Sequence, residues 1–425
     1  MSKKVSIIFF IVLFFSSLVV STSYADNAEV LPKGVHRVSV DTNYYLPFDE
    51  RYNPDGEVED IAVDYNTSLN SNVFPALSLV ESAFSLPPGS GSIGDSVVSL
   101  KYQYTLINLS FQYGVSDRFT AGINIPYWYK KNKVEASLDS SSGSSATVGK
   151  SAIGTALGAP LVPLTGGGPF GDAVPLTTED VQNLLGGGLD TNGDGTIDIA
   201  GFGYKRFETW SDNGIGDIEA GFRYQYYKTD DWRLSFTGGG RLPTGEIDDP
   251  DNLTDLPLGE GAYVLLLRFN NDYTRIKNLV LHGTFRYDHY FSVKQEKRVP
   301  DDVNRPITNN KEEVGRKIGD ALELEASGQY TLLKGLNLSL LYKYAFAFKD
   351  EVSGNLGFAY ESLENETNYS EHVLISGLSY TTIPLYMENK FPLPLTASIS
   401  YRNKIAGSNN ALKSQYIAMG LSVLF

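Results

Sequence analysis

The stretch LDTNGDGTIDIAG, residues 189–201, has the spacing of a calcium-binding loop. Counted from Asp190, oxygen-bearing side chains stand at the first, third, fifth and ninth places, and the seventh place can offer its backbone carbonyl, as in loops of the EF-hand type. Gly195 at the sixth place permits the sharp turn that such loops need. The candidate calcium ligands are Asp190, Asn192, Asp194, Thr196 and Asp198.

The twelfth place of this loop departs from the pattern, because it holds Gly201 where an EF-hand loop has a bidentate glutamate. The missing ligand must come from elsewhere in the chain or from water. The alternative is a polar turn, which acidic Asn-Gly-Asp-Gly sequences also make. The preceding residues 177–185 predict a short helix with a capping-box start. Calcium here would order a surface loop and take no part in catalysis.

Charged side chains of both signs recur on one face of stretches that alternate between apolar and polar residues. Between Asp217 and Tyr226, every second residue is apolar or aromatic, and the intervening residues include Glu219 and Arg223. The side-chain period of a strand places these two sets on opposite faces. The charged residues expected to line the interior of a closed sheet are Arg223, Arg268, Arg286, Glu219, Glu323, Glu325, Lys343 and Arg402.

Two roles are open for these charges. They can pair with one another and fill the interior of a narrow barrel, or they can line a pore and set its selectivity. Catalysis is not expected, because twelve-stranded outer-membrane phospholipases need a His and a Ser on one strand face. None of the 4 histidines is followed by a serine two residues later.

The elements that must position these residues are about twelve alternating segments, most of them longer than strands of soluble sheets. Such lengths suit tilted strands that cross a bilayer. In 97–114 the alternation changes phase near Leu106, which predicts a β-bulge. The segments are 34–46, 97–114, 117–130, 215–228, 232–244, 259–270, 278–292, 319–332, 336–349, 369–383, 393–404 and 413–425.

The connections between these segments alternate between long and short, and the longest are 47–96 and 131–214. Long loops at one end and short turns at the other are typical of outer-membrane barrels. Every backbone polar group must be paired inside a bilayer, so only a closed sheet can place strands there. The sequence therefore predicts an all-β fold, a transmembrane antiparallel barrel of about 12 strands with periplasmic termini and long extracellular loops. The alternative is a soluble β-sandwich.

The N-terminal residues predict export. Two lysines precede an apolar run, and the small residues Ser23 and Ala25 fit a signal-peptidase site, so residues 1–25 are expected to be a cleaved signal peptide. After cleavage, residues 26–425 would form a single barrel domain. The alternative for residues 1–25 is a membrane anchor. The absence of cysteine excludes disulfides, and a net charge of −15 argues against nucleic acid as a partner.

Two further segments carry expectations. The last residues, MGLSVLF, alternate into Phe425, as in barrel proteins whose last strand is read by the outer-membrane assembly machinery. Residues 71–88 are apolar and compatible with a helix, which could fold into the barrel mouth as a lid or rest on its rim.

Three motifs resemble an outer-membrane family named for the meta-cleavage pathway of phenol degradation. They are NGIGDIEAGFRYQYY from residue 213, GGGRLPTGE at 238–246 and LGEGAY at 258–263. The resemblance implies a transporter of small, often aromatic or apolar compounds, and it identifies no binding residue. Within the chain, Ile-Gly-Asp recurs before three of the strands, where Gly permits an unusual backbone turn and Asp caps a rim loop. A cation-binding rim is the alternative.

Together these patterns predict a porin-like channel in a Gram-negative outer membrane, with lipid and a small solute as its partners. Uptake would be passive. The alternative is a non-transporting barrel whose large extracellular loops bind a partner or a surface.

Overall fold

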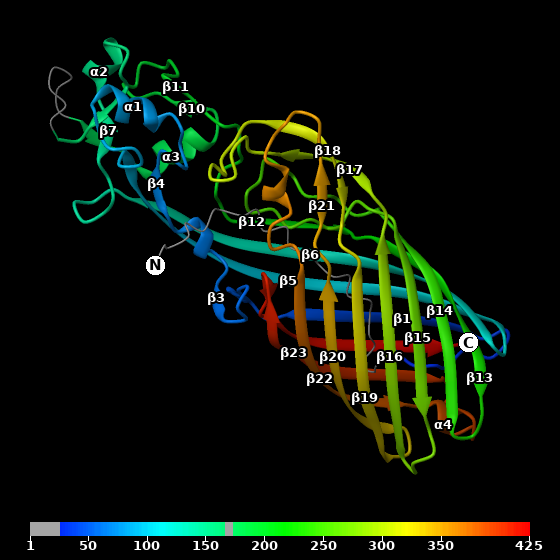
Figure 1. The fold of residues 1–425 in the computed structure, drawn as a ribbon. Helices are drawn as coiled ribbons and strands as arrows, with labels where there is room; N and C mark the ends of the chain where they lie inside the picture. The colour runs from blue at the N-terminus through cyan, green and yellow to red at the C-terminus, as the bar shows by residue number, and fades with distance from the viewer. Residues whose placement is uncertain (1–25, 166–172) are drawn as a thin grey trace.

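The computed structural model describes residues 26–165 and 173–425, and 12 of its strands form a closed antiparallel barrel (Figure 1). Consecutive strands pair with one another. The first strand closes the barrel on the last, from Arg37 opposite Leu424 to Tyr45 opposite Tyr416. The 12 barrel strands are β1 (His36–Tyr45), β5 (Ser92–Ser116), β6 (Phe119–Asp139), β13 (Ile218–Lys228), β14 (Trp232–Leu242), β15 (Val264–Tyr273), β16 (Leu279–Tyr290), β19 (Ala321–Leu333), β20 (Leu336–Ala347), β22 (Tyr369–Thr381), β23 (Leu395–Ser408) and β25 (Gln415–Leu424).

Each alternating segment of the sequence corresponds to one barrel strand, so the predicted fold class is confirmed. The predicted signal peptide, 1–25, lies outside the described residues. Within the described ranges, no helix has the length and apolar character needed to cross a membrane.

A row of phenylalanine rings crosses four neighbouring strands on the outer face of the barrel. Phe222, Phe236, Phe269 and Phe285 come from four neighbouring strands, and successive ring centroids lie 6.2, 5.2 and 6.4 Å apart. Tyr226 and Trp232, near strand ends, are also exposed, as is Tyr129 in the middle of β6. Cross-strand aromatic pairs stabilise a sheet, and their place on the outside leaves the inner face to polar side chains.

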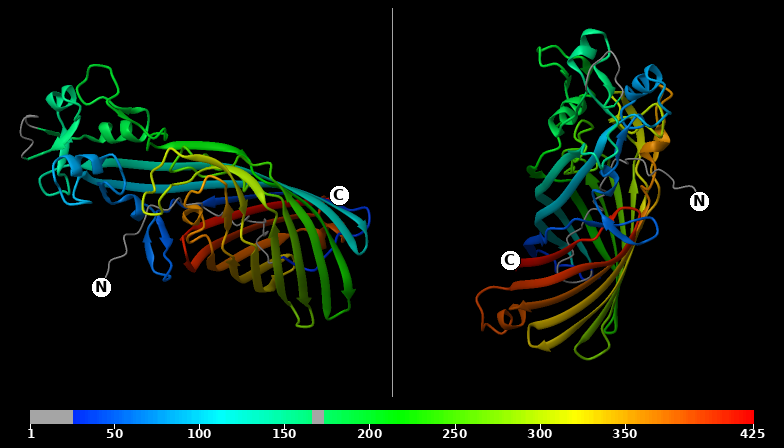
Figure 2. Two further views of the ribbon diagram at one scale, coloured as in Figure 1. Left: turned by 45° about the horizontal axis from the view of Figure 1, so that its top comes forward. Right: turned by 90° about the vertical axis from the view of Figure 1, so that its left-hand side faces the viewer.

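Strands β5 and β6 are much longer than the others and continue beyond the barrel as a two-stranded ribbon (Figure 2). The predicted bulge near Leu106 is wrong, because β5 keeps its register with both β1 and β6 there. Instead the apolar side chains change faces. Leu100 and Leu106 point inward and are buried, whereas Leu109 and Phe111, nearer the turn, are exposed on the outer face.

The ribbon carries a separate folded unit with its own apolar core, and we call this unit the loop domain. Its elements come from the two long connections: β4 (Ser68–Asn70), α1 (Leu77–Ala83), β7 (Val148–Lys150), α2 (Ala152–Ala156), β8 (Leu161–Pro163), β9 (Val174–Pro175), α3 (Thr178–Leu185), β10 (Gly188–Leu189) and β11 (Ile199–Ala200). The predicted helix is confirmed as α3, with a capping box between Thr177 and Asp180. Helix α1 packs in this core through Leu77 and Val80, so residues 71–88 neither plug the barrel nor lie on its rim.

The remaining elements are short. At the long-loop end, β2 (Glu50–Tyr52), β3 (Val58–Asp60) and β24 (Ala411–Leu412) form one small sheet, and β17 (Val293–Arg298), β18 (Lys311–Lys317) and β21 (Glu351–Ser353) form another. Two 3-10 helices, η1 (Val63–Tyr65) and η3 (Tyr360–Leu363), lie in loops. Strand β12 (Trp210–Ile215) pairs with β6, and α4 (Ile383–Tyr386) forms one of the turns at the opposite end.

Candidate functional site in the barrel lumen

The eight predicted lumen residues lie on strands whose inner faces meet inside the barrel. The strand register places some of them in a row across neighbouring strands: Arg268 is opposite Arg286, and Arg286 is opposite Glu323. Glu325 is opposite Lys343 on the next strand pair. Because side chains opposite one another are neighbours on the same face, the charges form a band around the interior.

Most of these charges are paired. Glu219 accepts a hydrogen bond from Arg241 at 2.9 Å, and the Lys343 ammonium lies 2.7 Å from Glu323. Lys343 also lies 3.6 Å from Glu371, and Arg402 lies 3.8 Å from the same carboxylate. Opposite charges brought together in this way compensate part of their desolvation cost, so pairing accounts for much of the band.

Three members of the band, Glu371, Lys404 and Arg241, were not predicted from the sequence. Glu371 has Lys404 at 2.6 Å, and Arg241 lies 3.3 Å from Asp288. Glu371 alternates with Val373 and Ile375, which are buried and apolar. The alternation of the strand could have placed Glu371 on the inner face. It did not, because Val373 and Ile375 on the same face are apolar and made that face look like the outer one.

The segment Asp26–Lys33, which we call the N-terminal segment, enters the lumen ahead of β1. The carboxylate of Asp26 pairs with Arg223 and lies 3.1 Å from Arg268. The Ala28 amide donates to the Asp272 carboxylate at 3.0 Å, and the Gln225 side chain donates to the Ala28 carbonyl at 2.7 Å. These contacts reach β13 and β15 at once.

Further contacts fix the two ends of the N-terminal segment. The Leu31 amide donates to the Thr120 hydroxyl on β6 at 2.8 Å, and the Thr284 hydroxyl on β16 donates to the Asp26 carbonyl at 3.1 Å. The Asp26 amide donates to Glu325 at 3.4 Å. The segment is therefore tied to strands around the lumen and occupies part of it, a placement that its short polar sequence did not reveal.

A cavity of about 600 Å³ lies beside the N-terminal segment and opens toward the short-turn end of the barrel. Its walls include Leu31 and Pro32 of the segment, Arg37 and Gln112 of β1 and β5, and Arg233 of β14. Both polar and apolar side chains line it, so a small solute could contact either kind of surface.

The other end of the lumen is closed by an apolar core that we call the mouth cluster. Inward side chains of the barrel wall pack against residues of the 47–96 and 243–263 connections there. Its members are Tyr45, Phe48, Ile61, Ala62, Tyr65, Leu100, Tyr102, Tyr104, Leu106, Trp128, Val134, Leu256, Leu258, Tyr416 and Ala418. The described barrel is therefore filled at both ends, by apolar contacts at one and by the charged N-terminal segment at the other.

The three sequence motifs of the resemblance converge on Asp217. One oxygen of its carboxylate accepts the Gly245 amide at 2.9 Å, and the other accepts the Glu260 amide at 2.9 Å. A side chain at Gly259 would meet the Asp217 carboxylate, since an added Cβ would lie 2.3 Å from it. The aspartate of this Ile-Gly-Asp motif therefore caps backbone amides of a rim loop, as the sequence predicts.

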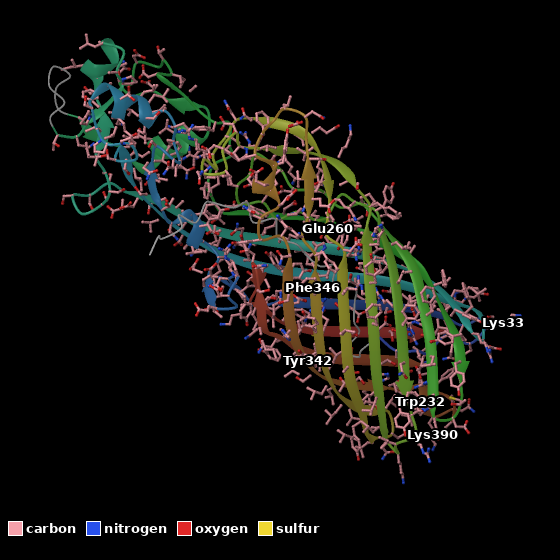
Figure 3. All side chains as sticks on the ribbon, in the orientation of Figure 1. Lys33, Trp232, Glu260, Tyr342, Phe346 and Lys390 are labelled. Carbon is pink, nitrogen blue, oxygen red and sulfur yellow. The ribbon has the colours of Figure 1, made fainter. Side chains whose placement is uncertain are left out.

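Glu260, beside this cap, is a half-buried acid in the 243–263 connection, and Figure 3 shows it on the loop-domain side, away from Trp232 and Lys390. Its Oε1 atom has no hydrogen-bond partner among the described residues. Burial raises the pKa of Glu260 to about 7, although Arg316 and Arg241 act in the opposite direction.

The candidate calcium residues lie together in one exposed loop, and their carboxylates accept hydrogen bonds from backbone amides and a hydroxyl of the same loop. Asp190 accepts hydrogen bonds from the Gly193 and Gly195 amides at 2.7 and 2.8 Å, and Asp198 turns to the Thr191 hydroxyl at 2.6 Å. In the described part of the chain, no group of three or more His, Cys, Asp or Glu side chains is arranged to hold a metal ion. The residues do not converge on one point, and calcium binding stays a prediction.

Comparisons with known proteins give a fold and no family. No family model and no curated protein matches the chain. Among solved structures, an outer-membrane channel from Pseudomonas putida F1 has a TM-score of 0.51 at 12% identity over 95% of this chain and 99% of that one. Two others have lower TM-scores.

These are the toluene transporter of Ralstonia pickettii, at 0.34 with 10% identity over 93% of this chain and 90% of that one, and a FadL homologue of Pseudomonas aeruginosa, at 0.33 with 10% identity over 92% of this chain and 90% of that one. The chain is thus similar in fold to an outer-membrane channel.

Proposed function

We propose that the protein is a channel of the Gram-negative outer membrane for the passive uptake of small apolar or aromatic solutes. The observation that carries this proposal is a closed barrel with an apolar, aromatic outer face and a charged inner face beside a cavity of about 600 Å³. An apolar belt on closed strands is the arrangement that a bilayer requires.

The orientation follows from the loops. Short turns are typical of the periplasmic side and long loops of the cell surface, which puts the loop domain outside the cell and both termini on the periplasmic side. Cleavage of the signal peptide after Ala25 would release Asp26 as the first residue. Phe425 exchanges backbone hydrogen bonds with His36 at the closing seam, where recognition by the assembly machinery would complete the barrel.

The solute class rests on two supports. The first is that the motifs around Asp217, Gly245 and Gly259 resemble the family of the phenol meta-pathway. The second is the mouth cluster, because a solute that passes it must displace apolar contacts. An apolar solute replaces such contacts at a lower cost than a hydrated one.

In the described state the mouth cluster and the N-terminal segment occupy the lumen, and uptake would require the segment to leave its contacts with Arg223 and Arg268. Several ion pairs and hydrogen bonds hold a segment of eight residues, and no covalent link fixes it among the described residues. We propose that the segment moves aside while the barrel wall stays intact.

Uptake by intact cells tests this function. A Gram-negative host that lacks channels for aromatic compounds would express the full chain, and accumulation of labelled toluene would be compared with that of cells carrying an empty vector. The proposal expects faster accumulation with the chain. Equal rates, with folded protein present in the outer membrane, would favour the alternative below.

The second candidate is a non-transporting barrel whose loop domain binds a partner or a surface. The observation that favours it is the filling of the lumen at both ends, by the mouth cluster and by the N-terminal segment. It predicts that no variant of the N-terminal segment changes permeation.

A further inference from the structure

The loop domain contains an apolar cavity of about 70 Å³ that is partly open to solvent. It lies where the loop domain meets the β5–β6 ribbon. Its walls come from separate parts of the chain: Leu69 and Phe74 from the first long connection, Val98 and Ala136 from the ribbon, and Val181 and Phe207 from the second long connection.

The polar groups around this cavity are satisfied by one another. The Tyr65 hydroxyl donates to the Leu253 carbonyl at 2.6 Å. Gln182 donates to the Phe207 carbonyl at 3.2 Å and accepts the Phe207 amide at 3.0 Å, and the Thr178 hydroxyl accepts the Leu138 amide at 3.0 Å. No charged residue lines the cavity, and no lining residue is among the described ones with an unpartnered buried polar atom.

This chemistry determines what the cavity can take. A water molecule needs two or more polar partners to be stable in a protein interior, and apolar cavities stay dry and accept small apolar molecules. An engineered cavity of about 150 Å³ holds benzene, so about 70 Å³ with one open side accommodates the edge of one aromatic ring or a short alkyl chain. Stability alone would favour larger side chains at Val98, Ala136 and Val181, because unfilled space forfeits dispersion contacts.

The cavity adjoins the route into the barrel. Phe207 and Leu253 line it and also pack against the mouth cluster. The rings of Phe207 and Tyr65 meet edge to face with centroids 5.4 Å apart, and Tyr65 belongs to the mouth cluster. Apolar contacts therefore continue from the cavity to the top of the lumen.

We propose that this cavity is a binding site for a small uncharged aromatic or alkyl molecule. Its role as the capture site that feeds the channel rests on the proposed function. The binding itself does not, since it depends only on the shape and the apolar lining of the loop domain.

The test uses the full chain in amphipol, because detergent would compete for apolar sites, with fluorobenzene as the probe and fluorine NMR titration as the measurement. Ala136→Trp and Val181→Phe fill the cavity from the ribbon and from α3 respectively. Glu135→Trp is the matched control, since Glu135 precedes Ala136 on β6 and is exposed on the other face of the strand.

We expect both filling variants to weaken fluorobenzene binding at least tenfold and Glu135→Trp to change it less than twofold. Probe that only coats the apolar belt of the barrel would bind all four proteins alike. That result, or undiminished binding by either filling variant with a folded barrel, overturns the proposal. Toluene uptake by cells expressing the same variants distinguishes the capture role of the cavity from the channel function of the barrel. If a variant loses binding and uptake is unchanged, only the capture role is refuted. If the chain binds fluorobenzene and shows no uptake, only the channel function is refuted.

Discussion

At the scale of single residues, Asp217 has the clearest task. Its two carboxylate oxygens each hold one backbone amide, from Gly245 and from Glu260, in connections that are otherwise irregular. A carboxylate that accepts backbone N–H groups replaces the ladder bonds that a strand would supply. The residue therefore joins the start of β13 to the connection between β14 and β15.

Replacing Asp217 by Ala leaves both amides without their acceptor. Each unsatisfied buried group costs about 1–3 kcal/mol, so we expect the free energy of unfolding to fall by about 2–4 kcal/mol. Urea unfolding of the protein in detergent, followed by tryptophan fluorescence, measures the change. Asp230→Ala, in the exposed β13–β14 turn, is the control and should change stability by less than about 0.5 kcal/mol. Equal stability of the two variants would contradict the role given to Asp217.

Glu260 predicts a dependence of stability on pH. Its pKa is raised from 4.5 to about 7 in the fold, so between these values the folded state binds more protons than the unfolded state. Stability is then highest below about pH 4.5 and falls as the pH rises toward 7, by an amount of order 1–3 kcal/mol for this group. Glu260→Gln should remove this part of the decrease, whereas Glu361→Gln, at an exposed position, should retain it. Parallel pH profiles for the wild type and Glu260→Gln would refute the assignment.

The luminal residues show what alternation can and cannot predict. It placed Arg223, Glu323 and Lys343 on one face, because a period of two is a local property of the chain. It did not show that Arg223 meets Asp26, because that contact joins residues 197 positions apart. Nor did the separate motifs indicate that Gly259 would lie against Asp217.

At the scale of elements, β5 shows how a correct pattern led to a wrong conclusion. Its apolar face changes sides near Leu106, and in a strand that stays in one environment this requires a bulge. The strand instead passes from a barrel wall with an apolar outer face to a ribbon whose inner face packs on the mouth cluster. Sequence alternation reports the environment of each residue, and the environment changes along β5.

The N-terminal segment was missed for a different reason. Eight residues with two acids, one lysine and one proline show no periodicity, and their partners lie on β6, β13, β15 and β16. Only the closed barrel brings those strands around the segment. By contrast, α3 was predicted correctly, since its capping box lies within four consecutive residues.

The loop at 189–201 carries the calcium prediction. Calorimetric titration of the full chain with calcium is expected to give binding at about 0.1–1 mM, the range of extracellular modules, because the loop must rearrange to gather its oxygens. Asp190→Ala should abolish the binding, since Asp190 is the first ligand of the motif, and Asp230→Ala should leave it intact. Titrations of these two variants that cannot be told apart would rule out the loop as the site.

At the scale of the whole molecule, closure of the barrel has a direct consequence in gels. A closed sheet without free edges resists detergent, so the unheated protein should migrate faster in SDS gels than the boiled protein. Identical migration, together with solubility of the chain in the absence of detergent, would contradict a membrane barrel and support the soluble alternative.

The central claim is that the lumen is a solute path closed by the N-terminal segment. The chain has no cysteine, so the double variant Ala28→Cys/Gln225→Cys allows this segment to be tied to β13 by a reducible bis-methanethiosulfonate cross-linker, which replaces the reach of the Gln225 side chain to the Ala28 carbonyl. The measurement is single-channel conductance in planar bilayers, with cross-link formation verified by mass and with the two single-cysteine variants, treated with the same reagent, as controls. The account predicts that openings disappear in the cross-linked double variant and return on reduction, while both single variants still open. Openings that persist with the cross-link formed would contradict it.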